Sequence, residues 1–134
     1  MTWRESGDNP DEEQARRHLR LLRRLAAGHR WRRMLDSPRP PYLLPLAREF
    51  LLDAAVRIGD QSEVRRVIWE ALAADMPQQH YLRLARLLIA AGRMEDAGIV
   101  NLLITAPDLR AKFNALKERA ELKNKEPLVP REEA

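Results

Sequence analysis

Residues 45–77 read PLAREFLLDAAVRIGDQSEVRRVIWEALAADMP, and this stretch decides the fold class. Apolar side chains recur in it every three or four residues, which is the spacing of one face of an α-helix. Gly59 interrupts the pattern once, and Asp60 follows it as a residue type that caps helix starts. The stretch therefore predicts two amphipathic helices, one ending at Ile58 and one opening at Asp60.

The same helical spacing continues on both sides of this stretch, and no run of residues alternates as a strand would. Prolines and glycines fall between the apolar runs and mark the helix boundaries. We therefore expect an all-α protein of about six helices: residues 10–26 with a stop near Gly28 and a further turn or two up to residue 35, residues 45–58, a helix from Asp60 to the stop at residues 75–77, residues 78–91, residues 94–105, and a last helix from Pro107.

The helix expected over residues 94–105 has almost no polar face. From Ala97 to Ile104 only Asn101 is polar. Exposing such a helix to water is unfavourable by roughly 25 cal/mol per Å² of apolar surface, so helices of this kind lie at a domain centre or in an interface. We expect it to be the core helix.

The length of 134 residues is typical of one domain that buries its own core. The expected organisation is an acidic, flexible N-terminus over residues 1–9, a single helical domain over residues 10–123, and a flexible tail over residues 124–134. Within the domain, a proline-rich elbow over residues 36–45 separates the basic first helical segment, residues 10–35, from helical hairpins over residues 46–123.

Two stretches of the chain are similar to each other: IGDQSEV from Ile58 and AGRMEDA from Ala91. Their glycines are 33 residues apart, and each is followed five residues later by a small residue that starts the next packed face. This pattern resembles the turn between the two helices of a tetratricopeptide-type repeat. The resemblance covers about residues 46–108 and implies antiparallel hairpins that stack into a protein-binding surface. An ordinary compact helical bundle that turns at glycines remains the alternative.

Several classes of function find no support in the sequence. The chain has no cysteine, which excludes disulfides and thiol chemistry and favours a cytoplasmic location. Its three histidines and three serines form no metal-ligand or nucleophile motif, and no phosphate loop is present. We expect no enzyme activity, no cofactor and no metal. Neither a secretory signal nor an integral membrane span is expected.

Positive charge is concentrated in one segment. Residues 14–35 contain eight arginines and no acidic residue, whereas the whole chain has a net charge of +4. Arginine binds phosphates and carboxylates through paired hydrogen bonds, and a tryptophan among arginines can stack on a base or on a guanidinium. The alternatives are an acidic protein surface as the partner and a solvated face paired with nearby acids. The candidate anion-binding residues are Arg16, Arg20, Arg23, Arg24, Arg30, Trp31, Arg32 and Arg33.

Three residues of the hairpin region are candidates for contact with a protein partner: Trp69, Tyr81 and Asn101. Trp69 lies off the apolar face of its helix, where an aromatic side chain can anchor a partner, whereas Tyr81 also suits the core. The leading hypothesis is a non-enzymatic helical adaptor or structural subunit of a larger complex that binds another protein through its hairpins. The alternative is an accessory subunit that contacts the backbone of RNA or DNA through its arginine-rich first helix.

Overall fold

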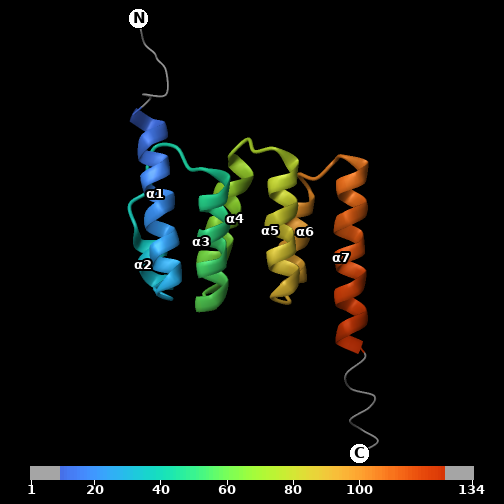
Figure 1. Ribbon diagram of the computed structural model, residues 1–134. Helices are drawn as coiled ribbons and strands as arrows, with labels where there is room; N and C mark the ends of the chain where they lie inside the picture. The colour runs from blue at the N-terminus through green and yellow to red at the C-terminus, as the bar shows by residue number, and fades with distance from the viewer. Residues whose placement is uncertain (1–9, 126–134) are drawn as a thin grey trace, which may run out of the picture. The chain divides into compact units, whose positions relative to one another are not determined.

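The computed structural model describes residues 10–125, and all regular structure in that range is helical. The all-α class predicted from the sequence is therefore confirmed. Figure 1 shows the helices in chain order. The described residues form seven helices: α1 Pro10–Ala27, α2 Trp31–Asp36, α3 Pro45–Ile58, α4 Gln61–Ala73, α5 Gln78–Ala90, α6 Met94–Asn101 and α7 Pro107–Lys125.

The chain divides into two compact units, and the boundary between them in the sequence falls after Ala71, near the end of α4. In the first unit, α3 packs against both α1 and α2, and α1 packs against α2. Its fully buried side chains include Leu22 of α1, Met34 of α2, Leu51 of α3 and Ile68 of α4. Each comes from the apolar stripe of an amphipathic helix, so burial of these stripes is what holds the unit together.

In the second unit α5 packs extensively against both α6 and α7, whereas α6 and α7 contact each other much less. Leu84 and Leu88 of α5 are buried with Val100 of α6 and Phe113 of α7. The expectation that residues 94–105 form the core helix is therefore wrong. The helix α6 ends at Asn101, and the next side chain, Leu102, is 74% exposed.

The side chain of Gln78 binds the backbone that follows α6. Its Oε1 atom accepts hydrogen bonds from the backbone N–H groups of Thr105 and Ala106, both at 2.8 Å, and its Nε2 atom donates to Thr105 Oγ1 at 2.7 Å. These backbone donors are thus satisfied outside a helix, and the chain turns directly into α7. The partner lies 27 residues away in sequence, so the apolar pattern alone could not reveal it.

Two of the predicted glycine stops are confirmed. Gly59 and Gly92 follow α3 and α5 in the left-handed conformation, with φ of 81° and 78°. The N–H of Gly92 donates to Ile89 and that of Arg93 to Leu88, which satisfies the last carbonyls of α5. Glycine is favoured here because a Cβ atom makes positive φ unfavourable.

The first helix ends near Gly28 as expected, but its left-handed residue is His29, with φ of 57°. The expected cap of α4 is also present, because Asp60 Oδ1 accepts hydrogen bonds from the N–H groups of Ser62 and Glu63 at 3.0 and 3.4 Å.

The segment between α2 and α3 is not helical, as the prolines predict. At the C-terminal end α7 continues through Asn124 and Lys125, so the helix extends two residues into the expected tail. The flexible termini expected over residues 1–9 and beyond residue 125 lie outside the described residues.

Candidate polyanion-binding site

The helix α1 has two chemically different faces. Ala15, His18 and Leu22 are buried on one of them. Arginines occupy the other: at about 3.6 residues per turn, Arg17, Arg20 and Arg24 lie within about 60° of one another around the helix axis, opposite the buried residues. The arginine face follows directly from residue spacing, because the apolar stripe must face the core and the arginines then face water.

Four arginine side chains of this face line an open surface hollow of about 490 Å³: Arg17, Arg20, Arg23 and Arg24. They extend over about 10 Å of helix, given a rise of about 1.5 Å per residue. Each guanidinium carries up to five N–H donors in a planar fork that matches the oxygens of a phosphate or carboxylate. The lining of the hollow is therefore chemically suited to anionic groups.

Acidic residues of the first turn neutralise only the N-terminal part of this face. Arg16 lies 3.5 Å from Glu12 and 3.3 Å from Glu13, and Arg17 and Arg20 lie 3.5 and 4.0 Å from the same Glu13 carboxylate. These pairs are solvent-exposed, and such pairs contribute at most about 1 kcal/mol. Arg16 does not line the hollow.

The C-terminal part of the face has no such partners. Within the part of the chain that the structure describes, neither Arg23 nor Arg24 forms an ion pair. Both side chains are exposed. A ligand that binds them would therefore not have to displace an internal carboxylate.

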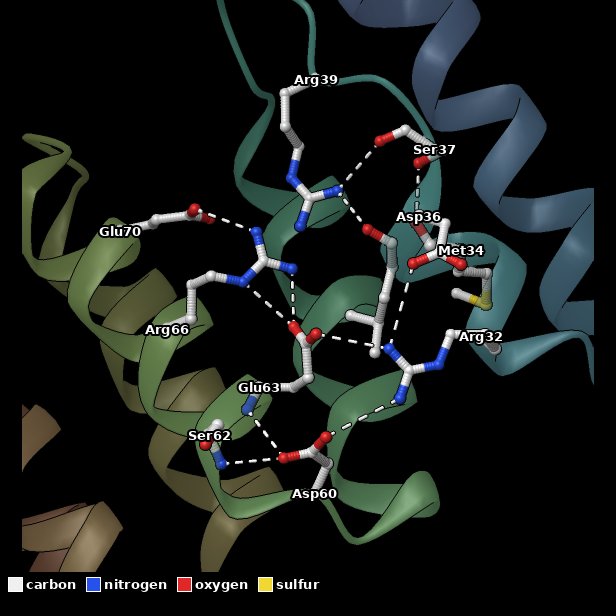
Figure 2. A network of polar contacts seen from close by, with 11 residues as sticks. Arg32, Met34, Asp36, Ser37, Arg39, Asp60, Ser62, Glu63, Arg66 and Glu70 are labelled. Carbon is white, nitrogen blue, oxygen red and sulfur yellow. Dashed lines mark hydrogen bonds and ion pairs between the residues drawn. The ribbon is translucent and has the colours of Figure 1, made fainter.

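The structure separates Arg32 from the other predicted arginines. Figure 2 shows its guanidinium between α2 and α4. There it lies 3.3 Å from Glu63, 3.8 Å from Asp60 and 3.9 Å from Asp36. Arg32 thus fastens α2 to the start of α4, whereas Arg30 and Arg33 remain exposed.

The same network continues along α4 and explains the role of Glu63. Arg66 donates to Glu63 Oε1 through Nε and a terminal nitrogen, at 3.0 and 2.6 Å, and lies 3.6 Å from Glu70 (Figure 2). The hydrogen bond with Glu63 raises the pKa of Arg66. The carboxylate of Glu63 therefore holds two arginines, Arg32 and Arg66.

Arg39, in the segment between α2 and α3, is half-buried near this network. One of its terminal nitrogens donates to the carbonyl groups of Leu35 at 2.9 Å and Ser37 at 3.1 Å. Burial lowers the pKa of its guanidinium, and the neighbouring Arg66 acts in the same direction, while Glu70 opposes them. Arg39 therefore stabilises the turn after α2 and does not belong to the arginine face of α1.

Trp31 was expected to stack either on a base or on a guanidinium, and in the structure it stacks on a guanidinium. The guanidinium belongs to Arg57 of α3, whose Cζ atom lies 4.8 Å from the indole centroid. Asp53 holds Arg57 in this place through two hydrogen bonds of 3.1 Å. Trp31 therefore joins α2 to α3 and is half-buried.

His29 is a site residue that the sequence reasoning missed. Its ring stacks on Trp31, with the centroids 5.3 Å apart and the planes at 16°. The residue is exposed and directly follows the arginine helix. A histidine two residues before a tryptophan in an arginine-rich segment was the available signal, but only the turn geometry brings the rings together.

The three residues considered for protein contact lie in different environments. The indole of Trp69 is 59% exposed on α4. Tyr81 is 3% exposed, and its hydroxyl donates to the carbonyl of Ala74, so the ring packs inside its own unit. Asn101 is half-exposed at the end of α6. Of the three, only Trp69 presents a large apolar surface.

No group of three or more histidine, aspartate or glutamate side chains within residues 10–125 has a geometry suited to a metal ion. None of the helices in this range combines the length and the apolar character that a bilayer span requires. Comparison with protein-family models, with curated proteins and with solved structures finds no match to this chain.

Proposed function

We propose that this protein is a non-enzymatic helical subunit that binds the phosphate backbone of a nucleic acid through the arginine face of α1. The observation that carries the proposal is the hollow lined by Arg17, Arg20, Arg23 and Arg24. Two of these four arginines have no acidic partner among the described residues. Their charge is available to a ligand.

The shape of the hollow favours an extended polyanion over a small enclosed ligand. It is open to solvent and follows the axis of one helix. One strand of a duplex presents a phosphate about every 3.4 Å along its axis, so about 10 Å of helix can face about three phosphates. Each neutralised phosphate releases counterions, which makes the binding strongly dependent on salt. The cysteine-free sequence suits the cytoplasm, where we place this binding.

Fluorescence polarisation with generic single-stranded and duplex oligonucleotides, at low and moderate salt, tests the proposal. The wild-type protein is expected to bind both at low salt and to lose affinity as salt rises. The double variant Arg23→Glu and Arg24→Glu should lose this binding, because it reverses the two unpaired charges.

The matched control carries Arg86→Glu and Arg119→Glu, which makes the same change in net charge at exposed positions of α5 and α7. It should keep the binding of the wild type. If the control loses as much affinity as the α1 variant, the binding reflects total charge and the proposed site is wrong. Circular dichroism checks that both variants remain helical.

A second candidate function, a protein adaptor, is supported by the exposed indole of Trp69. Aromatic residues that anchor partners are typically large and accessible. The similar turns at Gly59 and Gly92, each followed by a buried small residue, Val64 and Ala97, are compatible with tetratricopeptide-like hairpins. A protein partner that co-purifies with the wild type and with the Arg23 and Arg24 variant, but not with Trp69→Ala, would favour this function.

A further inference from the structure

His29 has an unusual backbone conformation for its residue type. Among the described residues it is the one non-glycine with positive φ, at 57°. A side chain makes this region unfavourable, and the residue immediately before it is a glycine that does not use it. The turn therefore places an imidazole where glycine would be less strained.

Two sets of interactions hold this conformation. The N–H of His29 donates to Ala26 at 3.0 Å and the N–H of Arg30 to Leu25 at 2.9 Å, which satisfies the last carbonyls of α1. The imidazole then lies on the indole of Trp31, with an angle of 16° between the rings. Trp31 is in turn held by Arg57 of α3. The ring of His29 is thus supported from one side.

His29 is accessible to a ligand in spite of this stacking. The residue is exposed although the indole of Trp31 stacks on its ring. His29 lies close to the hollow in the chain. The N–H of Gly28 donates to the carbonyl of Arg24 at 3.2 Å, so the last turn of α1 carries the last arginine of the hollow, and His29 follows this turn directly.

We propose that His29 is a stacking platform for a base of single-stranded nucleic acid whose phosphates lie along Arg17, Arg20, Arg23 and Arg24. This inference rests on the proposed function and narrows its ligand to single strands. In a duplex the base faces are stacked on one another, whereas a single strand can place a base on an exposed ring. Proteins that bind single strands without sequence preference combine such rings with a cationic groove.

Three probes of equal length separate base stacking from phosphate binding: a single-stranded DNA, the same strand without bases, and the duplex. The abasic strand keeps the phosphates and removes the stacking partners. The wild-type protein is expected to bind the single strand about fivefold more tightly than the abasic strand, or better, given the contribution of one stacked base.

The test variant is His29→Gly, because glycine adopts positive φ without strain and the turn is expected to fold. The variant should bind the single strand only as tightly as the abasic strand, with unchanged affinity for the abasic strand and the duplex. His29→Asn, which also tolerates this conformation but has no aromatic ring, should behave in the same way. A protein with Trp3→Phe and Trp69→Phe reports on Trp31 fluorescence, which should change with the single strand but not with the abasic strand.

Equal binding of the single and abasic strands by the wild type would overturn the stacking platform. So would a His29→Gly variant that keeps the wild-type preference. In both cases the proposed function would still hold if the protein binds the strands in a salt-dependent way and the Arg23 and Arg24 charge reversals remove this binding. If none of the probes binds at low salt, the stacking platform and the proposed function are both wrong.

Discussion

The imidazole Nε2 atom of His18 lies 3.2 Å from the hydroxyl oxygen of Ser37, and this contact joins α1 to the segment after α2. Both residues are buried. The hydroxyl of Ser37 donates to the carbonyl of Met34 at 2.6 Å, so its oxygen accepts from the imidazole and Nε2 carries the proton. The buried Nδ1 atom has no hydrogen-bond partner among the described residues, so a second proton there would be unsatisfied and the neutral histidine fits this site.

This arrangement predicts a loss of stability in mild acid. Burial lowers the pKa of His18, and the charge of Arg39 acts in the same direction. Above a pH of about 6.5 the histidine is neutral in both states and stability is complete. Below that value the unfolded chain takes up a proton that the folded chain resists, so the free energy of unfolding falls by at most about 1.4 kcal/mol per pH unit.

Denaturant unfolding between pH 7.5 and about pH 5.5 checks this prediction, since carboxylates titrate mainly below that range. The His18→Gln variant, which cannot titrate there but keeps a donor, should show a flatter pH dependence than the wild type. If both proteins lose stability equally, His18 is not the group responsible.

Replacement of glycine by alanine is expected to change stability in opposite directions at the turns and inside a helix. An alanine Cβ at Gly59 or Gly92 would meet no atom within 4 Å, so the expected loss comes from positive φ alone. We expect Gly59→Ala and Gly92→Ala each to destabilise the protein by about 1 kcal/mol. Gly98 lies inside α6 without positive φ and with equal space, so Gly98→Ala should stabilise it by about 0.5–1 kcal/mol. Thermal unfolding of the three variants measures the difference, and a destabilised Gly98→Ala would contradict it.

The ion pair with Glu63 makes Arg32 less available to a ligand. Glu63→Gln weakens the interactions with Arg32 and Arg66, and because both arginine side chains are about half exposed we expect a loss of less than about 1 kcal/mol in stability. Arg32 then keeps only its longer ion pairs with Asp60 at 3.8 Å and Asp36 at 3.9 Å, so its charge becomes more available to a phosphate near Arg30 and Arg33. For single strands, the salt dependence of log Kobs should steepen by up to about 0.7.

The control for this experiment is Glu118→Gln on α7, which removes the same charge from an exposed position. Its salt dependence should match that of the wild type. A steeper slope in both variants would mean that Arg32 gains no phosphate contact when Glu63 is changed.

The arginine face itself predicts a definite salt slope. If the face neutralises about three phosphates of a single strand, log Kobs should fall with log salt with a slope of about −2.1, which is three times about −0.7. Arg24→Ala should reduce the slope by about 0.7, whereas Arg86→Ala should leave it unchanged. Polarisation titrations at several salt concentrations measure these slopes. An unchanged slope in Arg24→Ala would exclude Arg24 from the contact.

Local sequence patterns account for most of the helical architecture. The helix stops at Gly59 and Gly92 were predictable because a left-handed residue needs only its own steric freedom and the hydrogen bonds of the preceding turn. The start of α4 was predictable for the same reason, since Asp60 caps N–H groups two and three residues ahead. These hydrogen bonds join residues only a few positions apart, so a short stretch of sequence already contains both partners.

The misassigned core helix shows where such reasoning fails. The apolar run from Ala97 to Ile104 predicts a continuous buried helix, but Gln78 binds the backbone at Thr105 and Ala106 and the chain turns there. The central helix of that unit is α5, although its sequence carries several polar residues. Which apolar helix becomes central depends on contacts between helices, and the composition of one helix does not contain them.

The sequence by itself determined the all-α class, the glycine turns and the arginine face of α1, because each depends on residues within about one or two helical turns of one another. Only the tertiary structure decided which of those arginines are available. Arg32 is neutralised by Glu63, 31 residues away, while Trp31 is covered by Arg57 and supports His29. The physical reason is that ion pairing and ring stacking require contact in space, and folding alone brings these distant residues together.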